Sequence, residues 1–404
     1  MRTRLRSVIL LTLLPGLVIA MCGQQAESLG PVAWHTGDEK ANALPRKAAD
    51  KAQTQAAPVT KMQLFAWLVG GLSSADQIRE LRARGIAFEP DEACVRDLAA
   101  AGDDSSLTRE LRAAQRHLSA SQNAPANEES ISHMFKVALA VKKEDYRVAL
   151  RLMTPVLESD PNNPDLAFAL GNIFDELGDW ENASRAFSRA VELAPQFPYA
   201  HGQLSLMSSR LGDGERAEAQ AQAMLKLLPD NSDGHKLLGM ALAAQDDDEG
   251  AFQEYARALQ LNPNNAMVYY NIGVLRAAQK NWEEAIVAYR RAIKIGPAQW
   301  RFYNNLGNAL GKVGRREEAI KAFDKGRELA PHKAELLQSY GTLLCDSGRD
   351  EQAVQLFTEL LAATPDWNLA RPCLYRSLVR LGRDQEARQV KEEYIKYSPD
   401  HSPW

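Results

Sequence analysis

Cysteine is scarce in this sequence, and neither charge is in clear excess. Four cysteines occur among 404 residues, with no C-x-x-C pair and no zinc-like spacing. Thiols so few and so widely spaced exclude a disulfide scaffold, and we expect them to be free and mostly buried. The net charge is −4, from 48 basic and 52 acidic residues. Because this balance offers no general attraction for nucleic acid or acidic membranes, nucleic-acid binding is not expected.

Catalytic motifs are missing as well. The sequence contains no G-x-S-x-G, no H-E-x-x-H and no phosphate-binding glycine-rich loop. The fragment "GNALGK" at 307–312 lies in a helical stretch and its turn, with no strand before it. We therefore expect a protein that is not an enzyme and that carries no cofactor.

The N-terminus has the pattern of an export signal. Three arginines within the first six residues precede an apolar run at 8–20. The run is shorter than the about twenty residues that span a bilayer, so residues 1–20 are expected to be a signal peptide cut after Ala20. An uncleaved anchor is one alternative. A lipid anchor at Cys22 is another, although Met21 stands where such a signal has Gly, Ala or Ser. The protein is thus expected in the periplasm, associated with the cell envelope, or secreted.

Two polar segments divide the next hundred residues. Residues 21–60 have almost no periodic apolar face and predict a disordered linker. Residues 61–118 predict a small module of about four short helices, with N-caps at Ser74 and Asp91. A second linker covers 119–129. The pattern "GGLSS…I…L…RGIAFEP…L…AG" resembles a helical module that precedes repeat arrays in some exported bacterial proteins; the resemblance implies no function for it.

A 34-residue period fills the rest of the chain. Prolines recur in this register at 161, 195, 229, 263, 297, 331, 365 and 399, and alanines recur at 149, 183, 217, 251, 285, 319, 353 and 387. The period defines eight repeats within 130–401, numbered 1 to 8: 130–163 (degenerate), 164–197, 198–231, 232–265, 266–299, 300–333, 334–367 and 368–401. Each repeat holds two amphipathic stretches of about twelve to fourteen residues, too short to be stable without packing on neighbours.

The recurring residues resemble the tetratricopeptide repeat. In repeat 2 the pattern is carried by Leu170, Gly171, Gly178, Trp180, Ala183, Phe187, Ala190 and Pro195. The resemblance implies an all-α fold, an α-solenoid in which helix-turn-helix units form a right-handed superhelix. Small residues such as Gly273 are expected to bring the two helices of a repeat together, and rings such as Tyr289 to fill the groove towards the next repeat. Pro372 and Tyr375 predict distorted packing and fraying in repeat 8.

Two groups of polar residues could suggest a metal site. His133, His201 and His235 share the fourth position of their repeats, but no further ligand repeats with them. We expect these rings to pack between the paired helices. The acidic run 246–249 lacks the spacing of a calcium loop and is expected to cap the following helix. No metal site is predicted.

The first helices of such a solenoid line a concave groove through their second, fifth, sixth, ninth and twelfth positions. In repeats 4 to 7 the candidate peptide-binding residues at these positions are Lys236, Met267, Tyr270, Asn271, Arg301, Asn304, Asn305, Asn308 and Gln338. Asparagine is a poor interior helix residue, and its amide both donates and accepts, as an extended peptide backbone does. Other members of the family hold peptides with Asn at the sixth position, which Asn271 and Asn305 match. Simple solvation of these amides is the competing interpretation.

Together these features predict a non-enzymatic scaffold or adaptor of the cell envelope that holds an extended peptide or a partner protein in its groove. Contact with a membrane would come only through Cys22 or an uncleaved signal. An alternative function is that of a solute-binding or carbohydrate-processing protein with an unrecognised site where the module at 61–118 meets the repeats. A structural role through self-association is a third.

Overall fold

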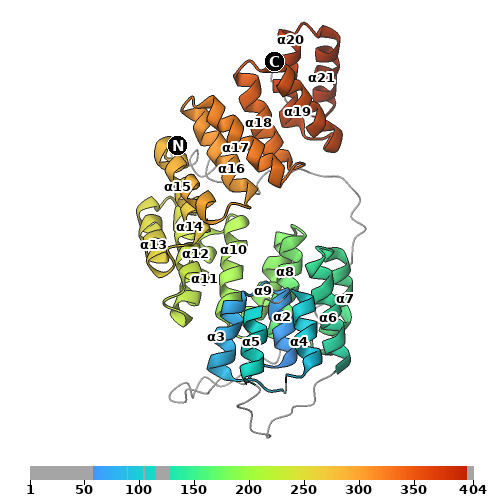
Figure 1. The fold of residues 1–404 in the computed structure, drawn as a ribbon, viewed down its shortest axis with the longest axis vertical. Coiled ribbons are helices and arrows are strands. Elements are labelled where there is room, and N and C mark those ends of the chain that lie inside the picture. The colour runs from blue at the N-terminus through green and yellow to red at the C-terminus, as the bar shows by residue number, and fades with distance from the viewer. Residues whose placement is uncertain (1–57, 89, 103–104, 115–127, 398–404) are drawn as a thin grey trace, which may run out of the picture. The chain divides into compact units, whose positions relative to one another are not determined.

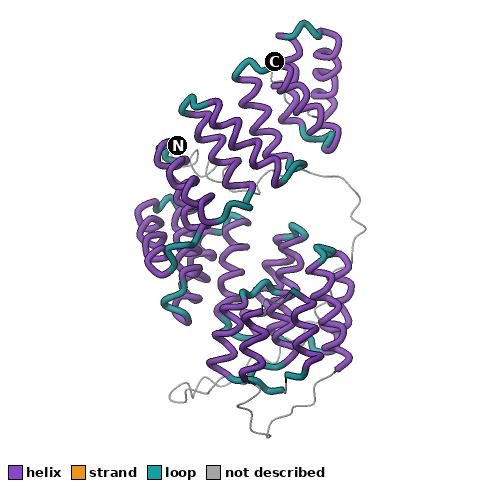
Figure 2. Tube along the Cα trace, viewed as in Figure 1, coloured by secondary structure: helices purple, strands orange, loops and turns teal. Residues whose placement is uncertain are grey.

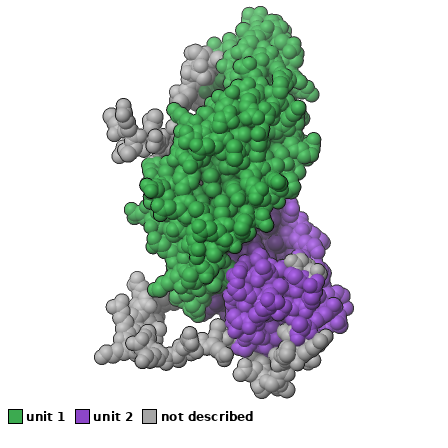
Figure 3. Space-filling model, turned by 60° about the vertical axis from the view of Figure 1, so that its left-hand side comes forward, with its two compact units in different colours: residues 1–20, 180–404 green, residues 21–179 purple. Residues whose placement is uncertain are grey.

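The computed structural model describes residues 58–88, 90–102, 105–114 and 128–397. The predicted signal peptide and most of both predicted linkers lie outside these residues. Twenty α-helices and one short 3₁₀ helix make up nearly all of the described chain (Figures 1 and 2), which confirms the predicted all-α helical-repeat solenoid. No described helix is both long and apolar enough to cross a membrane. The chain divides into two compact units, whose described parts begin at residues 58 and 180 (Figure 3).

The N-terminal compact unit holds seven described helices. They are α2 Lys61–Val69, α3 Ser74–Arg84, α4 Glu92–Ala101, α5 Ser105–Ala114, α6 Glu128–Lys142, α7 Tyr146–Ser159 and α8 Pro164–Glu176. The N-cap predicted at Asp91 is confirmed, because its carboxylate accepts the Cys94 amide at 2.6 Å. The N-cap predicted at Ser74 is wrong by one residue. Ser73 has the extended backbone and accepts the Asp76 amide at 3.2 Å, so Ser74 is already helical.

The C-terminal compact unit continues as helix pairs. They are α9 Trp180–Leu193, α10 Pro198–Arg210, α11 Gly214–Leu227, α12 Ser232–Ala244, α13 Asp248–Leu261, α14 Ala266–Ala278, α15 Trp282–Ile295, α16 Trp300–Lys312, α17 Arg316–Leu329, α18 Ala334–Asp346, α19 Asp350–Ala363, α20 Arg371–Arg380 and α21 Asp384–Tyr397. We call the first helix of each repeat its A helix and the second its B helix. The A helix of repeat 8 differs: it opens with the 3₁₀ helix Asn368–Ala370, and α20 has 10 residues where α18 has 13. This shortening agrees with the distortion predicted from Pro372.

Within a repeat, a glycine of the A helix packs against an aromatic ring of the B helix. A Cβ added to Gly273 would lie 2.5 Å from Cε1 of Tyr289, and one added to Gly307 would lie 2.7 Å from Cε2 of Phe323. Each ring thus lies on the glycine of its own A helix, a contact that was not predicted for it, and for Phe323 the predicted contact with the next repeat is confirmed. Phe323 also stacks on Tyr340 of the next repeat, with ring centroids 5.3 Å apart.

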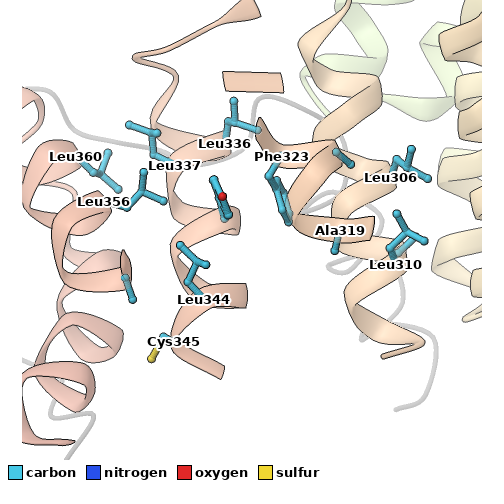
Figure 4. Packing of buried hydrophobic residues seen from close by; sticks show 14 of the residues in the cluster. Leu306, Leu310, Ala319, Phe323, Leu336, Leu337, Leu344, Cys345, Leu356 and Leu360 are labelled. Atoms are coloured by element: carbon cyan, nitrogen blue, oxygen red, sulfur yellow. The ribbon is translucent and has the colours of Figure 1, made fainter. Parts of the chain in front are cut away.

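The largest described core cluster lies in the C-terminal compact unit. It runs from Tyr270 in repeat 5 to Ala387 in repeat 8, and every repeat in between contributes leucines, alanines and a ring. Figure 4 shows Phe323 between Leu306 of its own repeat and Leu336 of the next. Because the apolar side chains of neighbouring repeats interlock, each helix obtains from its neighbours the burial that it lacks alone. The rigid stack of A helices that results carries the candidate site.

Candidate functional site

The A helices of repeats 1 and 2 are covered by a helix of the same chain. Helix α2 packs against both α6 and α8. The ring of Phe65 meets that of Phe135, at the sixth position of repeat 1, with centroids 5.8 Å apart. Phe168, at the fifth position of repeat 2, lies so close to Gly70 that an added Cβ would be 2.3 Å from its ring. The positions predicted to line a groove thus bind a peptide segment here, and that segment is internal and helical.

Polar contacts complete this internal docking. Asp165, at the second position of repeat 2, is only 6% exposed. One of its carboxylate oxygens accepts from Trp67 Nε1 at 2.6 Å, and the other accepts from Gln63 Nε2 at 2.8 Å. Burial raises the pKa of Asp165, while these two hydrogen bonds and the charge of Arg84 act in the opposite direction.

An asparagine amide holds a backbone carbonyl on this face. Asn172, at the ninth position of repeat 2, donates from Nδ2 to the carbonyl oxygen of Val69 at 2.8 Å. Val69 is the last residue of α2, where a helix leaves its carbonyls without intrahelical partners. Side-chain recognition of a peptide backbone by an A-helix amide is therefore present in the molecule. Sequence reasoning missed Asp165 and Asn172, because nothing in their spacing shows that α2 lies over them.

Two candidate residues of repeat 5 lie deeper than expected. Tyr270 is 4% exposed and Asn271 is 8% exposed, so the expectation that both present themselves at a groove surface is wrong. The physical reason is the ring of Tyr270, which packs on Phe302 at 5.1 Å and on Tyr289 at 5.9 Å. Burial of this aromatic area outweighs the loss of hydration of one hydroxyl. Burial also raises the pKa of Tyr270 to about 12.

The amides of repeat 6 form a chain that reaches repeat 5. Asn304 Nδ2 donates to Asn305 Oδ1 at 3.2 Å, and Asn305 Nδ2 donates to the hydroxyl of Tyr270 at 3.1 Å. The structure thus brings three predicted site residues together. Asn305 also has a structural role, because its amide hydrogen-bonds the buried hydroxyl of Tyr270.

Three amide atoms on consecutive A helices are buried without a hydrogen-bond partner among the described residues. They are Nδ2 of Asn271 in α14, Oδ1 of Asn304 in α16 and Oε1 of Gln338 in α18. Native proteins rarely leave such groups unpaired, because each one loses its hydrogen bond to water. The oxygens of Asn304 and Gln338 belong to half-buried side chains and could accept from the amides of a peptide backbone, whereas Asn271 is itself buried.

The remaining candidates lie singly along the same face. Lys236 pairs with Asp233 of its own helix at 2.7 Å. Arg301 stacks over the ring of Trp300 at 4.8 Å. Asn308 is half-buried at the ninth position of repeat 6, the position that Asn172 occupies in repeat 2. Besides its unpaired oxygen, Gln338 donates to Thr342 of its own helix, and Met267 is exposed at the second position of repeat 5.

Two of the three fourth-position histidines, His201 and His235, lie between paired helices as predicted, whereas Nδ1 of His133 lies 2.9 Å from the carbonyl oxygen of Glu129 in its own helix. His201 Nδ1 is 2.7 Å from Gln220 Oε1, and its Nε2 is 2.9 Å from the carbonyl oxygen of Pro195. His235 makes the equivalent two contacts in repeat 4. Asp247 caps α13 by accepting the Gly250 amide at 3.0 Å, as predicted for the acidic run. Within the described ranges, no three potential metal ligands converge.

The interface between the N-terminal module and the repeats is filled. Within the N-terminal compact unit, Trp67 and Phe168 are each 1% exposed where α2 meets α8. An open cavity of about 490 Å³ lies elsewhere, between α13 and α14, where Arg276 stacks on Phe252 at 4.0 Å. The carbohydrate-processing alternative stays a prediction.

Three family models match the helix pairs described above. A model of the TPR repeat matches residues 239–280 and 275–314. Two models of the tetratricopeptide repeat match residues 140–207 and 304–366. The chain is a tetratricopeptide repeat protein. Arrays of this repeat are in general protein-binding scaffolds and are usually not enzymes, and none of the three matching models is a catalytic family.

Several solved structures resemble this tetratricopeptide repeat array. The pilF structure from Pseudomonas aeruginosa is 21% identical, with 50% of this chain and 93% of that chain covered and a TM-score of 0.45. The structure of the APC/C hetero-tetramer Cut9–Hcn1 is 18% identical, with 78% of this chain and 69% of that chain covered and a TM-score of 0.48. A tetratricopeptide repeat protein from Parabacteroides merdae is 16% identical, with 62% of this chain and 100% of that chain covered and a TM-score of 0.49. No curated protein matches the sequence.

Proposed function

We propose that this tetratricopeptide repeat protein is a non-enzymatic scaffold of the cell envelope that binds a partner protein, or an extended peptide of it, along its A helices. The observation that carries the proposal is the hydrogen bond from Asn172 to the Val69 carbonyl. It is an A-helix amide bound to the backbone of a docked segment. The chain itself covers this face in repeats 1 and 2, so the free binding surface belongs to the A helices further along the array.

The unpaired amide atoms of repeats 6 and 7 support the same conclusion. The amides of a bound backbone would donate to Oδ1 of Asn304 and Oε1 of Gln338, the unpaired atoms that belong to half-buried side chains. Each bond contributes about 0.5–1.5 kcal/mol, and satisfying a buried group also removes its desolvation penalty. Recognition through the backbone depends little on the sequence of the partner, as suits a scaffold.

The location in the envelope rests on the predicted signal peptide. Export would place the array where the partner is another envelope protein. The mass of the mature chain tests this directly, because cleavage after Ala20, lipidation at Cys22 and retention of the whole N-terminus give three different masses. A full-length chain confined to the cytoplasm would refute the envelope role and leave the binding face unaffected.

A pull-down tests the binding face. Asn305 and Asn271 are poor choices for substitution, since one supports a buried hydroxyl and the other lies inside the core. Asn304→Ala/Asn308→Ala removes two half-buried amides from the same face. Gln352→Ala, which removes an exposed amide from the B helix α19, is the matched control. Two lost hydrogen bonds lower affinity on the order of tenfold, so the double variant should recover the partner poorly and the control normally.

The comparison is made on folded protein. Circular dichroism and the urea midpoint of both variants should match those of the parent chain. Equal partner recovery by the parent, the double variant and the control would remove the A-helix face from the account of binding.

A further inference from the structure

Two cysteines of consecutive A helices lie beside one guanidinium group. Cys345 lies in the last turn of α18 at the twelfth position of repeat 7, and Cys373 occupies the sixth position of repeat 8 in α20. Nη2 of Arg376 is 3.3 Å from both sulfur atoms, and its Nε is also 3.3 Å from the sulfur of Cys345. The sulfur of Cys345 lies 3.5 Å from the carbonyl oxygen of Cys373, and the two side chains hydrogen-bond to each other. Both thiols are free.

The surroundings of this pair differ from those of a thiol buried only for packing. Cys94, in α4, is such a thiol: it is fully buried, and burial raises its pKa to about 11. At the pair, hydrogen bonding from Cys373, Ser377 and Arg376 together lowers the pKa of Cys345 to about 6 against the effect of burial. The hydrogen bond with Cys345 raises the pKa of Cys373. A negative charge on either sulfur would face the guanidinium group of Arg376.

We propose that Cys345 and Cys373 form a reversible disulfide that ties repeat 8 to repeat 7, with the guanidinium group of Arg376 beside both sulfurs. The linked positions lie on the A-helix face, at the end of the array. The proposal does not depend on what the face binds.

The chemistry balances with a low-molecular-weight disulfide as oxidant. Cys373 is half-buried and Cys345 is fully buried, so Cys373 is the sulfur that solutes reach. Its thiol loses its proton to water, and the thiolate attacks one sulfur of the oxidant and releases one thiolate. The Cys345 thiol then loses its proton to water, attacks the sulfur of Cys373 in the mixed disulfide and releases the second thiolate. The protein loses two electrons and two protons, and the oxidant is reduced to two thiols.

The link would stabilise the helix pair of repeat 8, whose A helix is shortened to the 10 residues of α20. Among the described residues, α20 packs on α18 and α19 of repeat 7 and on α21 of its own repeat. A covalent bridge from α20 to α18 reduces the freedom of this repeat to open. Oxidation should therefore slow proteolysis within α20 and α21.

The experiment uses the full chain, reduced and then exposed to oxidised glutathione. Free thiols are blocked with N-ethylmaleimide in acid, and peptides are mapped by mass spectrometry. We expect a cross-linked peptide that joins Cys345 to Cys373 and unmodified Cys94. Cys373→Ser should abolish the link. Arg376→Gln should slow its formation several-fold, whereas Arg383→Gln, which removes an arginine paired with Glu386 at the start of α21, should leave the rate unchanged.

Folding of every variant is checked by circular dichroism before oxidation. A folded chain that gives no link between Cys345 and Cys373, or that gives only links to Cys22 or between molecules, overturns the proposal. Modification of Cys94 as fast as the pair would do the same, because it would show that Arg376 confers no selective reactivity. An unchanged rate in Arg376→Gln contradicts the role of the guanidinium.

Discussion

The contact between Gly307 and Phe323 predicts how Gly307→Ala changes the free energy of unfolding. The sign of that change should depend on whether the Phe323 ring is present. A methyl group at Gly307 would lie 2.7, 2.8 and 2.9 Å from three atoms of the fully buried Phe323 ring. The ring sits between its own A helix and Tyr340 of the next repeat, so it has little freedom to withdraw. Gly307→Ala should therefore destabilise the parent chain. In a Phe323→Ala background, the same substitution should stabilise.

The magnitudes follow from two opposing effects. Replacing a glycine within a helix by alanine gains about 1 kcal/mol of helix propensity. Overpacking a filled core costs about 1–3 kcal/mol. In the parent chain the net change in the free energy of unfolding is thus a loss of about 0–2 kcal/mol. Phe323→Ala alone costs about 3–5 kcal/mol through the cavity it leaves, but without the ring Gly307→Ala should restore about 1 kcal/mol.

Urea unfolding of the four chains, followed by far-UV circular dichroism, measures this cycle. Gly311→Ala is the matched control in the same helix, because its added methyl group would approach only the end of Leu343, at 3.0 Å. The slope of each transition should stay constant, since a change would indicate that repeats unfold separately. An equal effect of Gly307→Ala with and without the Phe323 ring would refute the pairing of small and large positions within one repeat.

Two further predictions concern buried polar groups. Burial raises the pKa of Asp165 above its ordinary 3.8, so the folded chain holds a proton that the unfolded chain releases. The parent should gain stability relative to Asp165→Asn as pH falls through the raised pKa, and lose that gain above it. Urea midpoints across this range test the sign, and a pH-independent difference contradicts it. His201→Leu leaves Gln220 and the Pro195 carbonyl without this partner and should cost about 1–3 kcal/mol, also by urea unfolding; an unchanged midpoint would show that the ring adds only packing.

The repeat architecture was predictable because its cause is periodic. Every 34 residues the same small, aromatic and proline positions return, and each set builds the same pair of helices. The caps at Asp91 and Asp247 were predictable for a local reason, since each side chain bonds an amide three residues ahead. Such features depend on neighbours in the sequence.

The candidate site was harder to predict because its exposure depends on contacts between repeats. Position alone placed Tyr270 and Asn271 at a surface, but rings from α15 and α16 bury Tyr270. Likewise, no pattern in repeat 2 shows that α2 lies over Asp165 and Asn172. The long-range partner decides whether an A-helix residue is free to bind, and 34-residue spacing carries no information about that partner.

The central claim is that the A-helix face beyond repeat 2 binds a partner protein. Photo-crosslinking tests it most directly, with a benzophenone amino acid placed at Asn308 on the face or at Gln352 on the B helix α19, followed by affinity isolation and mass spectrometry. The account predicts a cross-linked partner from Asn308 and none from Gln352. Cross-links from Gln352 with none from Asn308 would place binding on the B helices and contradict the claim.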